Sequence, residues 1–142
     1  IWKQTQGRIE YFFAGIGTGG TLSGVGKFLK EQNPDIRIIG VEPASRHHGL
    51  SGLKRITGLP DEHFPSILDK DLLDDVISVT DEEAFTAGIE VARREGIMVG
   101  PTTGAVAHAA LTHAADDAVA VAIAGDGAAK YLREYDEYLA TR

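Results

Sequence analysis

The 142-residue sequence predicts an α/β fold, a three-layer αβα sandwich built on a mainly parallel sheet. Short apolar runs of strand length alternate along the chain with longer segments of helical pattern. Some runs, such as residues 36–41, are continuously apolar, which is typical of strands buried in a parallel sheet. Two glycine- and hydroxyl-rich segments also follow apolar runs directly, as expected at the ligand-binding carboxyl edge of such a sheet.

Each element is predicted from its local pattern. Residues 43–71 are rich in glycine and proline and have no regular pattern. Thr80 and Glu83 have the spacing of a capping box at the start of a helix, and Thr102 or Thr103 is expected to cap the helix that follows. Strands are predicted at residues 9–14, 36–41, 76–79 and 118–124, helices at residues 21–31, 81–94, 105–114 and 128–139, and the end of a helix at residues 1–6.

Composition and charge limit the class of protein. The chain is long enough for the core of a single domain, and its hydrophobic fraction of 43% is ordinary. It contains no cysteine, which excludes disulfides and thiolate metal sites. No apolar run has the length of a membrane span, and the first residues do not resemble a signal peptide, so we expect a cytoplasmic protein. The net charge of −7 argues against nucleic acid and anionic membranes as partners.

The first glycine-rich segment, from Gly15 to Thr21, has the composition of an anion cradle. It follows a predicted strand and precedes a predicted helix. Glycines let backbone N–H groups approach a phosphate closely, and the start of a helix favours its negative charge. The hydroxyls of Thr18 and Thr21 can donate further hydrogen bonds. The segment therefore predicts a phosphate site, with a plain strand-to-helix turn as the alternative.

Different ligands fit this segment. The sequence GIGTGG, which begins at Gly15, matches G-x-G-x-x-G, and Glu42 ends the next apolar run, where a ribose-binding acid would stand. A Rossmann-type dinucleotide-binding domain is therefore one hypothesis. The glycines and threonines also suit a compact phosphate monoester surrounded by amides and hydroxyls. A third hypothesis is a non-catalytic domain that uses the fold for association, which predicts a turn blocked by side chains.

A second segment favours the phosphate monoester. Residues 95–105 read EGIMVGPTTGA, which is an apolar segment, a Gly-Pro break, two hydroxyls and the opening of a helix. With GTGGT at residues 17–21 and GVEP at residues 40–43, this segment closely resembles the cysteine synthase and cystathionine β-synthase family. These are pyridoxal-phosphate enzymes of the tryptophan-synthase-β-like fold, fold type II. The resemblance extends from about residue 15 to residue 132.

The resemblance implies a cofactor, a reaction and site residues. The cofactor would be pyridoxal 5′-phosphate, and the parent enzyme would replace the β-substituent of an activated serine with sulfur to make L-cysteine. Thr102 would hydrogen-bond the pyridine nitrogen, where a neutral hydroxyl favours β-elimination over transamination. Asp126 would lie near the pyridine edge, or it could equally be the N-cap of the final helix. The cofactor phosphate would be held by Gly17, Thr18, Gly19, Gly20 and Thr21.

The resemblance also implies parts that this sequence does not contain. Family members are longer, and their Schiff-base lysine lies in an S-x-K-x-R-like context followed by a TSGNTG-type loop. Neither motif occurs here, and the lysines of this chain are expected on solvated surfaces. We therefore expect residues 1–142 to be the C-terminal portion of a homodimeric enzyme, with no catalytic lysine of its own and no activity alone. The sulfur source, the acyl donor and the choice between cysteine synthase and cystathionine β-synthase stay open.

The remaining candidates have simpler interpretations. His47 and His48 are adjacent and point apart, and His108 and His113 lie on different faces of a helix, so we expect no metal site. Residues 51–53 correspond in position to a family segment at the substrate entrance, or form a plain linker. Three residues at helical spacing are expected to pack the final helix: Tyr131, Tyr135 and Tyr138.

Overall fold

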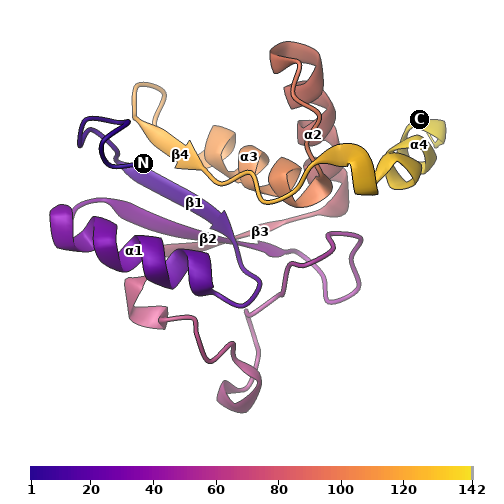
Figure 1. Cartoon of the computed structure of the whole chain (residues 1–142). Coiled ribbons are helices and arrows are strands. Elements are labelled where there is room, and N and C mark those ends of the chain that lie inside the picture. Colours follow the sequence, from indigo (N-terminus) through magenta and orange to yellow (C-terminus); the bar gives the residue numbers. More distant parts are fainter. Residues whose placement is uncertain (142) are drawn as a thin grey trace.

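A sheet of four parallel strands in the order β3-β2-β1-β4 forms the centre of the fold (Figure 1). The structure is a computed structural model and describes residues 1–141. The strands are β1 (Tyr11–Gly15), β2 (Arg37–Pro43), β3 (Asp75–Val79) and β4 (Ala120–Ala122). In the register of the sheet, Phe13 of β1 is paired with Ile39 of β2 and with Ala122 of β4. The predicted parallel sheet is confirmed, although β4 is shorter than residues 118–124.

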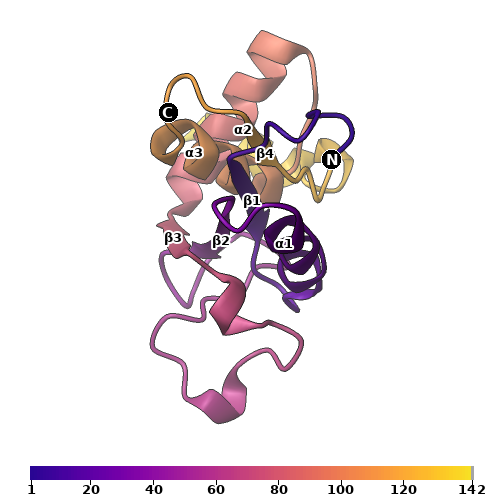
Figure 2. The same ribbon diagram turned by 90° about the vertical axis from the view of Figure 1, so that its left-hand side faces the viewer.

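Helices cover both faces of the sheet and complete the three predicted layers. Helix α1 (Gly20–Gln32) lies on one face, and helices α2 (Asp81–Glu95) and α3 (Pro101–His113) lie on the other (Figure 1). Figure 2 shows the long segment between β2 and β3 extending beyond the sheet on the α1 side. The last helix is α4 (Leu132–Ala140), and short 3-10 helices form at Asp61–His63, Lys70–Leu72 and Ala128–Lys130.

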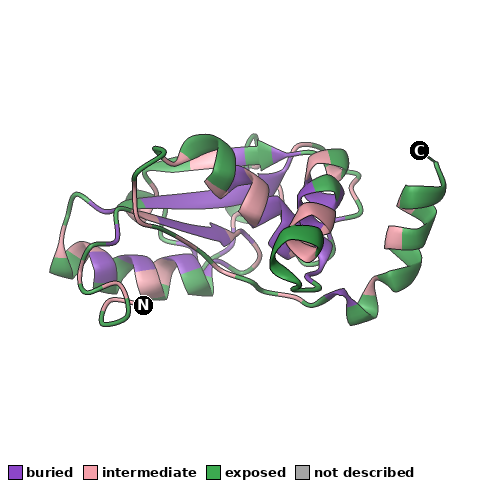
Figure 3. Ribbon diagram, turned by 90° about the horizontal axis from the view of Figure 1, so that it is seen from above, coloured by how far each residue is buried: buried purple, intermediate pink, exposed green. Residues whose placement is uncertain are grey.

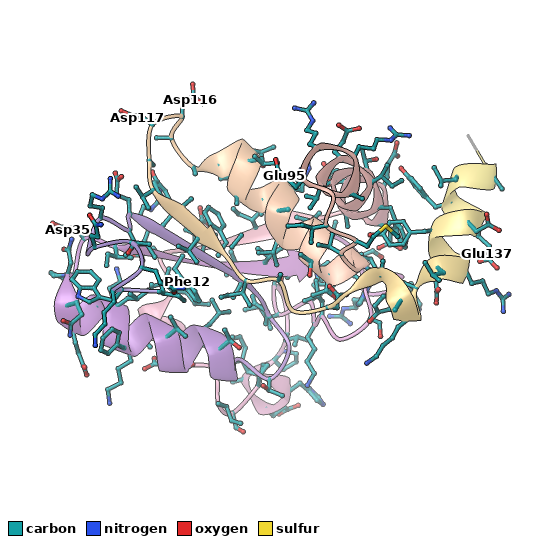
Figure 4. The ribbon with its side chains drawn as sticks, turned by 45° about the horizontal axis from the view of Figure 1, so that its top comes forward. Phe12, Asp35, Glu95, Asp116, Asp117 and Glu137 are labelled. Carbon is teal, nitrogen blue, oxygen red and sulfur yellow. The ribbon has the colours of Figure 1, made fainter. Side chains whose placement is uncertain are left out.

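The alternation of side chains along β1 builds a separate core on each face of the sheet. Phe12 packs with Leu22 and Leu29 of α1, whereas its neighbour Phe13 packs with Ala105 and other small residues of α3. Figure 4 shows Phe12 between the sheet and α1, and Figure 3 shows the central strands as buried and the edge strand β4 as largely exposed. Burial on both faces explains why the central strands β1 and β2 are largely apolar, whereas the edge strands β3 and β4 keep exposed positions.

Helices α2 and α3 pack closely because small residues meet at their crossing. A Cβ atom at Gly104 would lie 2.1 Å from the carbonyl oxygen of Ala84, so only glycine fits there. The predicted capping box of α2 is confirmed: Thr80 accepts the N–H of Glu83 at 3.2 Å, and the Glu83 carboxylate accepts the N–H of Thr80 at 2.8 Å. The hydrogen bonds that the Glu83 carboxylate accepts from the N–H and the hydroxyl of Thr80 lower its pKa below 4.5.

The structure corrects predictions at both ends of the chain and at α3. Residues 1–6 form hydrogen-bonded turns rather than an assigned helix, and Gln6 has a left-handed φ of 54°. Residues 128–139 are divided into a 3-10 helix and α4. The expectation that Thr102 or Thr103 caps α3 is wrong, because Gly100 is the N-cap and Pro101 the first helical residue.

Helix α4 projects from the body and is attached to α2 through aromatic contacts (Figure 3). The rings of Tyr135 and Tyr138 lie 5.1 and 5.2 Å from the ring of Phe85, and the Tyr135 hydroxyl donates to Val99 O at 3.0 Å. Burial, helped by the negative charge of Asp126, raises the pKa of Tyr135 to about 12. The predicted packing role is therefore confirmed for these two tyrosines. No helix within residues 1–141 combines the length and apolarity needed to cross a membrane.

Candidate functional site

The turn between β1 and α1 presents free backbone N–H groups. Gly19, the N-cap of α1, has a φ of 88°, a left-handed conformation that favours glycine. The first hydrogen bond of the helix start runs from Ser23 N–H to Gly19 O. In the part of the chain that the structure describes, no protein acceptor is found for the N–H groups of Gly17, Thr18, Gly19 and Thr21. Such N–H groups at the start of a helix form a ready anion-binding site.

This turn opens into a hollow of about 330 Å³, a volume within the range of small-ligand sites. Two further segments face it: residues 51–53 from the long loop, and, after β4, Ile123, Gly125, Asp126, Lys130 and Tyr131. The hollow brings together every residue that the sequence predicted to bind the cofactor, namely Gly17, Thr18, Gly19, Gly20, Thr21, Thr102 and Asp126. Their roles toward a cofactor stay predictions, but their convergence is a fact of the fold.

The glycines of the turn are needed because protein atoms press against them. A Cβ atom at Gly19 would lie 2.4 Å from the Cβ of Leu68, and one at Gly17 would lie 2.9 Å from the carbonyl oxygen of Gly52. The sequence explained glycine here by the close approach of a phosphate or by the geometry of a strand-to-helix turn. The structure adds that the long loop between β2 and β3 leaves no space for side chains at these positions.

Asp126 caps helix α3 from a distant segment. Its Oδ2 accepts the N–H of Thr102 at 3.1 Å and its Oδ1 accepts the N–H of Thr103 at 2.8 Å. The suggestion that Asp126 caps the final helix is wrong, because the N-cap of α4 is Tyr131. A carboxylate at the start of α3 is also favoured by the helix dipole. Asp126 nevertheless lines the hollow, so its predicted place near a pyridine ring stays open.

Thr102 connects α3 to the loop wall of the hollow. Its hydroxyl donates to the carbonyl oxygen of Ser51 at 2.9 Å. Residues 51–53, which the sequence left as either an entrance segment or a linker, therefore form one wall of the hollow. Because the Thr102 hydroxyl already has an acceptor, it must turn away from Ser51 to donate to a ligand.

Two further residues of the hollow were missed from the sequence. Lys130 and Tyr131 line it; Lys130 is exposed, as expected for a surface lysine, but its place at the hollow was not predicted, and Tyr131 was expected only to pack the final helix. Both precede α4, which begins only at Leu132. The glycines at 125 and 127 were the available signal, because they predict an irregular segment before the helix.

Glu42, the proposed ribose acceptor of the dinucleotide hypothesis, is not available to a ligand. It is 0% exposed. Its Oε2 accepts the N–H groups of Ile56 and Thr57 at 2.7 and 2.9 Å, and its Oε1 accepts the Ser78 hydroxyl at 2.9 Å. Burial alone would raise the pKa of Glu42, but hydrogen bonds from Thr57, Ile56 and Ser78 outweigh it and hold the pKa below 4.5. The structure therefore removes the main argument for dinucleotide binding.

The histidines are not among the residues that line the hollow, and His48, His108 and His113 contact neighbouring residues through their rings. His48 Nδ1 accepts the N–H of Leu50 at 3.1 Å, and His108 Nε2 lies 3.6 Å from the Glu83 carboxylate. The ring of His113 bonds to the Thr112 hydroxyl. Within residues 1–141, no group of three or more histidine or acidic side chains is arranged to hold a metal ion.

Comparisons with known proteins identify the family of the chain. The family model described as "Pyridoxal-phosphate dependent enzyme" matches residues 1–125. The chain belongs to this family of pyridoxal-phosphate-dependent enzymes.

Its relatives include cysteine synthases and cystathionine β-synthases. It is 44% identical to the cysteine synthase of Aquifex aeolicus (strain VF5), over 93% of this chain and 41% of that protein. It is 37% identical to the cystathionine β-synthase of Apis mellifera, over 95% of this chain and 29% of that protein. The crystal structure of O-acetyl serine sulfhydrylase isoform 3 from Entamoeba histolytica superposes with a TM-score of 0.80 at 25% identity, over 93% of this chain and 42% of that one. The chain thus spans less than half the length of each of these relatives.

Proposed function

We propose that this chain is part of a pyridoxal-phosphate-dependent enzyme of the cysteine synthase type. The enzyme would replace the β-substituent of an activated serine with sulfur to make L-cysteine. The observation that carries the proposal is the set of free N–H groups at the start of α1, which share one hollow with Thr102. The 44% identity to a cysteine synthase supports the choice of reaction.

The residues of the chain fit a phosphate-bearing pyridine cofactor. The N–H groups of residues 17–21 would hold its phosphate, because the start of a helix favours a dianion. The hydroxyl of Thr102 would face the pyridine nitrogen as a neutral donor, and Asp126 would hold that residue in place through the first turn of α3. When bound, the cofactor supplies the electron sink for the departure of the β-substituent.

Several parts of the proposal concern the whole enzyme. The S-x-K-x-R and TSGNTG-type motifs are absent from residues 1–142. We therefore propose that the Schiff-base lysine belongs to another part of a longer, cytoplasmic and homodimeric enzyme, and that this chain alone is inactive. Cystathionine β-synthase activity is the alternative, and it has support from the Apis mellifera relative. Assay of the longer enzyme with sulfide and with homocysteine as sulfur nucleophiles separates the two.

Ligand binding to the 142-residue chain tests the phosphate site directly. The probe is pyridoxine 5′-phosphate, which lacks the aldehyde and therefore forms no imine with surface lysines. We expect calorimetry to show saturable binding that inorganic phosphate displaces, and no binding of NAD. Thr21→Val, at an exposed hydroxyl of the turn, should weaken binding, and Thr141→Val, at the far end of the chain, should not. Binding of NAD without displacement by phosphate would overturn the proposal.

A further inference from the structure

Glu42 is a buried carboxylate for which the proposed chemistry has no use. No lysine, arginine or histidine forms an ion pair with it in the part of the chain that the structure describes. Its oxygens accept hydrogen bonds from the N–H groups of Ile56 and Thr57 and from the hydroxyl of Ser78, and the Thr57 side chain is a further donor. Burying an ionised carboxylate is costly unless it is fully hydrogen-bonded, so a carboxylate placed here with a complete set of donors needs an explanation.

The donors show that Glu42 ties the long loop to the sheet. Ile56 and Thr57 belong to the loop between β2 and β3, and Ser78 belongs to β3, so one side chain connects two strands and the loop. The same loop is attached to the cradle turn itself, because Lys54 N–H donates to Ile16 O at 2.7 Å. Residues 54–57 are thus fixed at both the sheet and the cradle.

The residues just before this attachment form the wall of the phosphate hollow. Gly52 O lies 2.9 Å from where a Cβ of Gly17 would be, and the Leu53 side chain lies 2.5 Å from where a Cβ of Gly15 would be. Ser51 O accepts the Thr102 hydroxyl at 2.9 Å. The wall therefore packs directly on the cradle glycines, and a shift of the loop would change the shape of the hollow.

We propose that Glu42 is a positioning residue that holds the wall formed by residues 51–53 against the cradle and thereby sets the affinity of the hollow for a phosphate monoester. The identity of the ligand rests on the proposed function. The claim that Glu42 ties the long loop to the sheet rests only on the hydrogen bonds of Glu42.

The test compares two carboxylate-to-amide substitutions in the 142-residue chain. Glu42→Gln leaves one carbonyl oxygen in place of two carboxylate oxygens and removes the negative charge, so the hydrogen bonds from Ile56, Thr57 and Ser78 cannot all be kept in their present form. Asp74→Asn is the matched control, because Asp74 Oδ2 accepts the N–H of Ile38 at 2.7 Å near the opposite end of β2. The readouts are hydrogen exchange and amide chemical shifts by NMR, and calorimetric affinity for pyridoxine 5′-phosphate and for inorganic phosphate.

We expect Glu42→Gln to speed amide exchange at Ile56 and Thr57, to move the amide shifts of residues 51–53, and to weaken binding of pyridoxine 5′-phosphate roughly tenfold or more. Asp74→Asn should leave that affinity within about twofold of the wild type, since it lies away from the wall. Equal affinity for Glu42→Gln and the wild type, or an equal loss in both variants, would overturn the proposal.

Two further outcomes, a variant that does not fold and a wild-type chain that binds neither probe, are interpreted separately. If Glu42→Gln does not fold, Ser78→Ala removes one donor and keeps the carboxylate, and it should weaken binding by a smaller factor while the chain stays folded. An unchanged affinity in Ser78→Ala, together with unchanged shifts at residues 51–53, would then contradict the tether. If the wild-type chain binds neither probe, the proposed function is wrong, and the exchange and shift data still decide whether Glu42 holds the wall.

Discussion

Asp126 and Thr103 lie 23 residues apart in the sequence and hold the start of α3 against the segment after β4. The Thr103 hydroxyl lies 2.6 Å from Oδ1 and 2.9 Å from the carbonyl oxygen of Asp126, and it accepts the N–H of Asp126 at 3.2 Å. The N-cap residue Gly100 has no side chain with which to make such bonds, and a Cβ there would lie 2.3 Å from the Asp126 carboxylate. This pair therefore fixes the helix turn that carries Thr102.

Replacement of Asp126 tests this distant cap. Asp126→Ala should lower the free energy of unfolding by about 1–3 kcal/mol, because it removes a cap and leaves N–H groups of α3 unpaired. Urea denaturation measures the change. Asp116→Asn and Asp117→Asn are controls, since both side chains are exposed on the turn between α3 and β4 and point away from the fold (Figure 4). A loss for Asp126→Ala no larger than for these controls would contradict the cap.

Two glycines of the first helix should respond in opposite directions to alanine. Gly19→Ala puts a Cβ 2.4 Å from Leu68 and keeps a left-handed φ, so we expect it to destabilise the protein by about 2 kcal/mol or more and to weaken phosphate binding. At Gly24, within α1, an added Cβ would meet no atom within 4 Å, so Gly24→Ala should stabilise by about 0.5–1 kcal/mol. Thermal or urea unfolding measures both. Similar effects of the two substitutions would show that the turn is not tightly packed.

The hydroxyl of Thr102 should matter more for the reaction than for stability. In the longer enzyme, Thr102→Ser keeps the hydroxyl and should retain β-replacement, whereas Thr102→Val should lower kcat by roughly tenfold or more. Loss of the bond to Ser51 O should cost Thr102→Val about 1 kcal/mol of stability. Steady-state kinetics and urea unfolding separate the two effects. A full kcat in Thr102→Val would mean that the residue only anchors the loop.

Two glutamates with lowered pKa values should make the fold sensitive to acid. Glu42 and Glu83 both have folded pKa values below 4.5, so the stability they contribute is complete above that pH and is lost as the pH falls through the lower folded values. Urea unfolding from pH 7 down to about pH 3 should show this loss, and Glu42→Gln and Glu83→Gln should each flatten it. Glu31→Gln, exposed on α1, controls for removal of a negative charge. If both variants lose as much stability at acid pH as the wild type does, the prediction is contradicted.

Local patterns predicted most of the elements and the glycine-rich cradle, whereas the family resemblance implied the roles of Thr102 and Asp126. The parallel strands and the capping box of Thr80 and Glu83 follow from apolar periodicity and from residue types at fixed spacing, which act within a few residues. The sequence could not predict which group accepts the hydrogen bonds of the free N–H groups at the start of α3. A cap from Asp126 depends on the return of β4 to the sheet beside β1, which brings residue 126 to that helix.

The amino-acid sequence by itself determined that glycines and hydroxyls stand at the carboxyl ends of strands, and its motifs carried the family resemblance. Only the tertiary structure decided how these residues are held. Glu42 changed from a possible ligand-binding acid to a buried tether, and Gly17 and Gly19 proved to be packed against the long loop. The physical reason is that burial and hydrogen-bond partners depend on segments far apart in the chain, whereas propensity and spacing act locally.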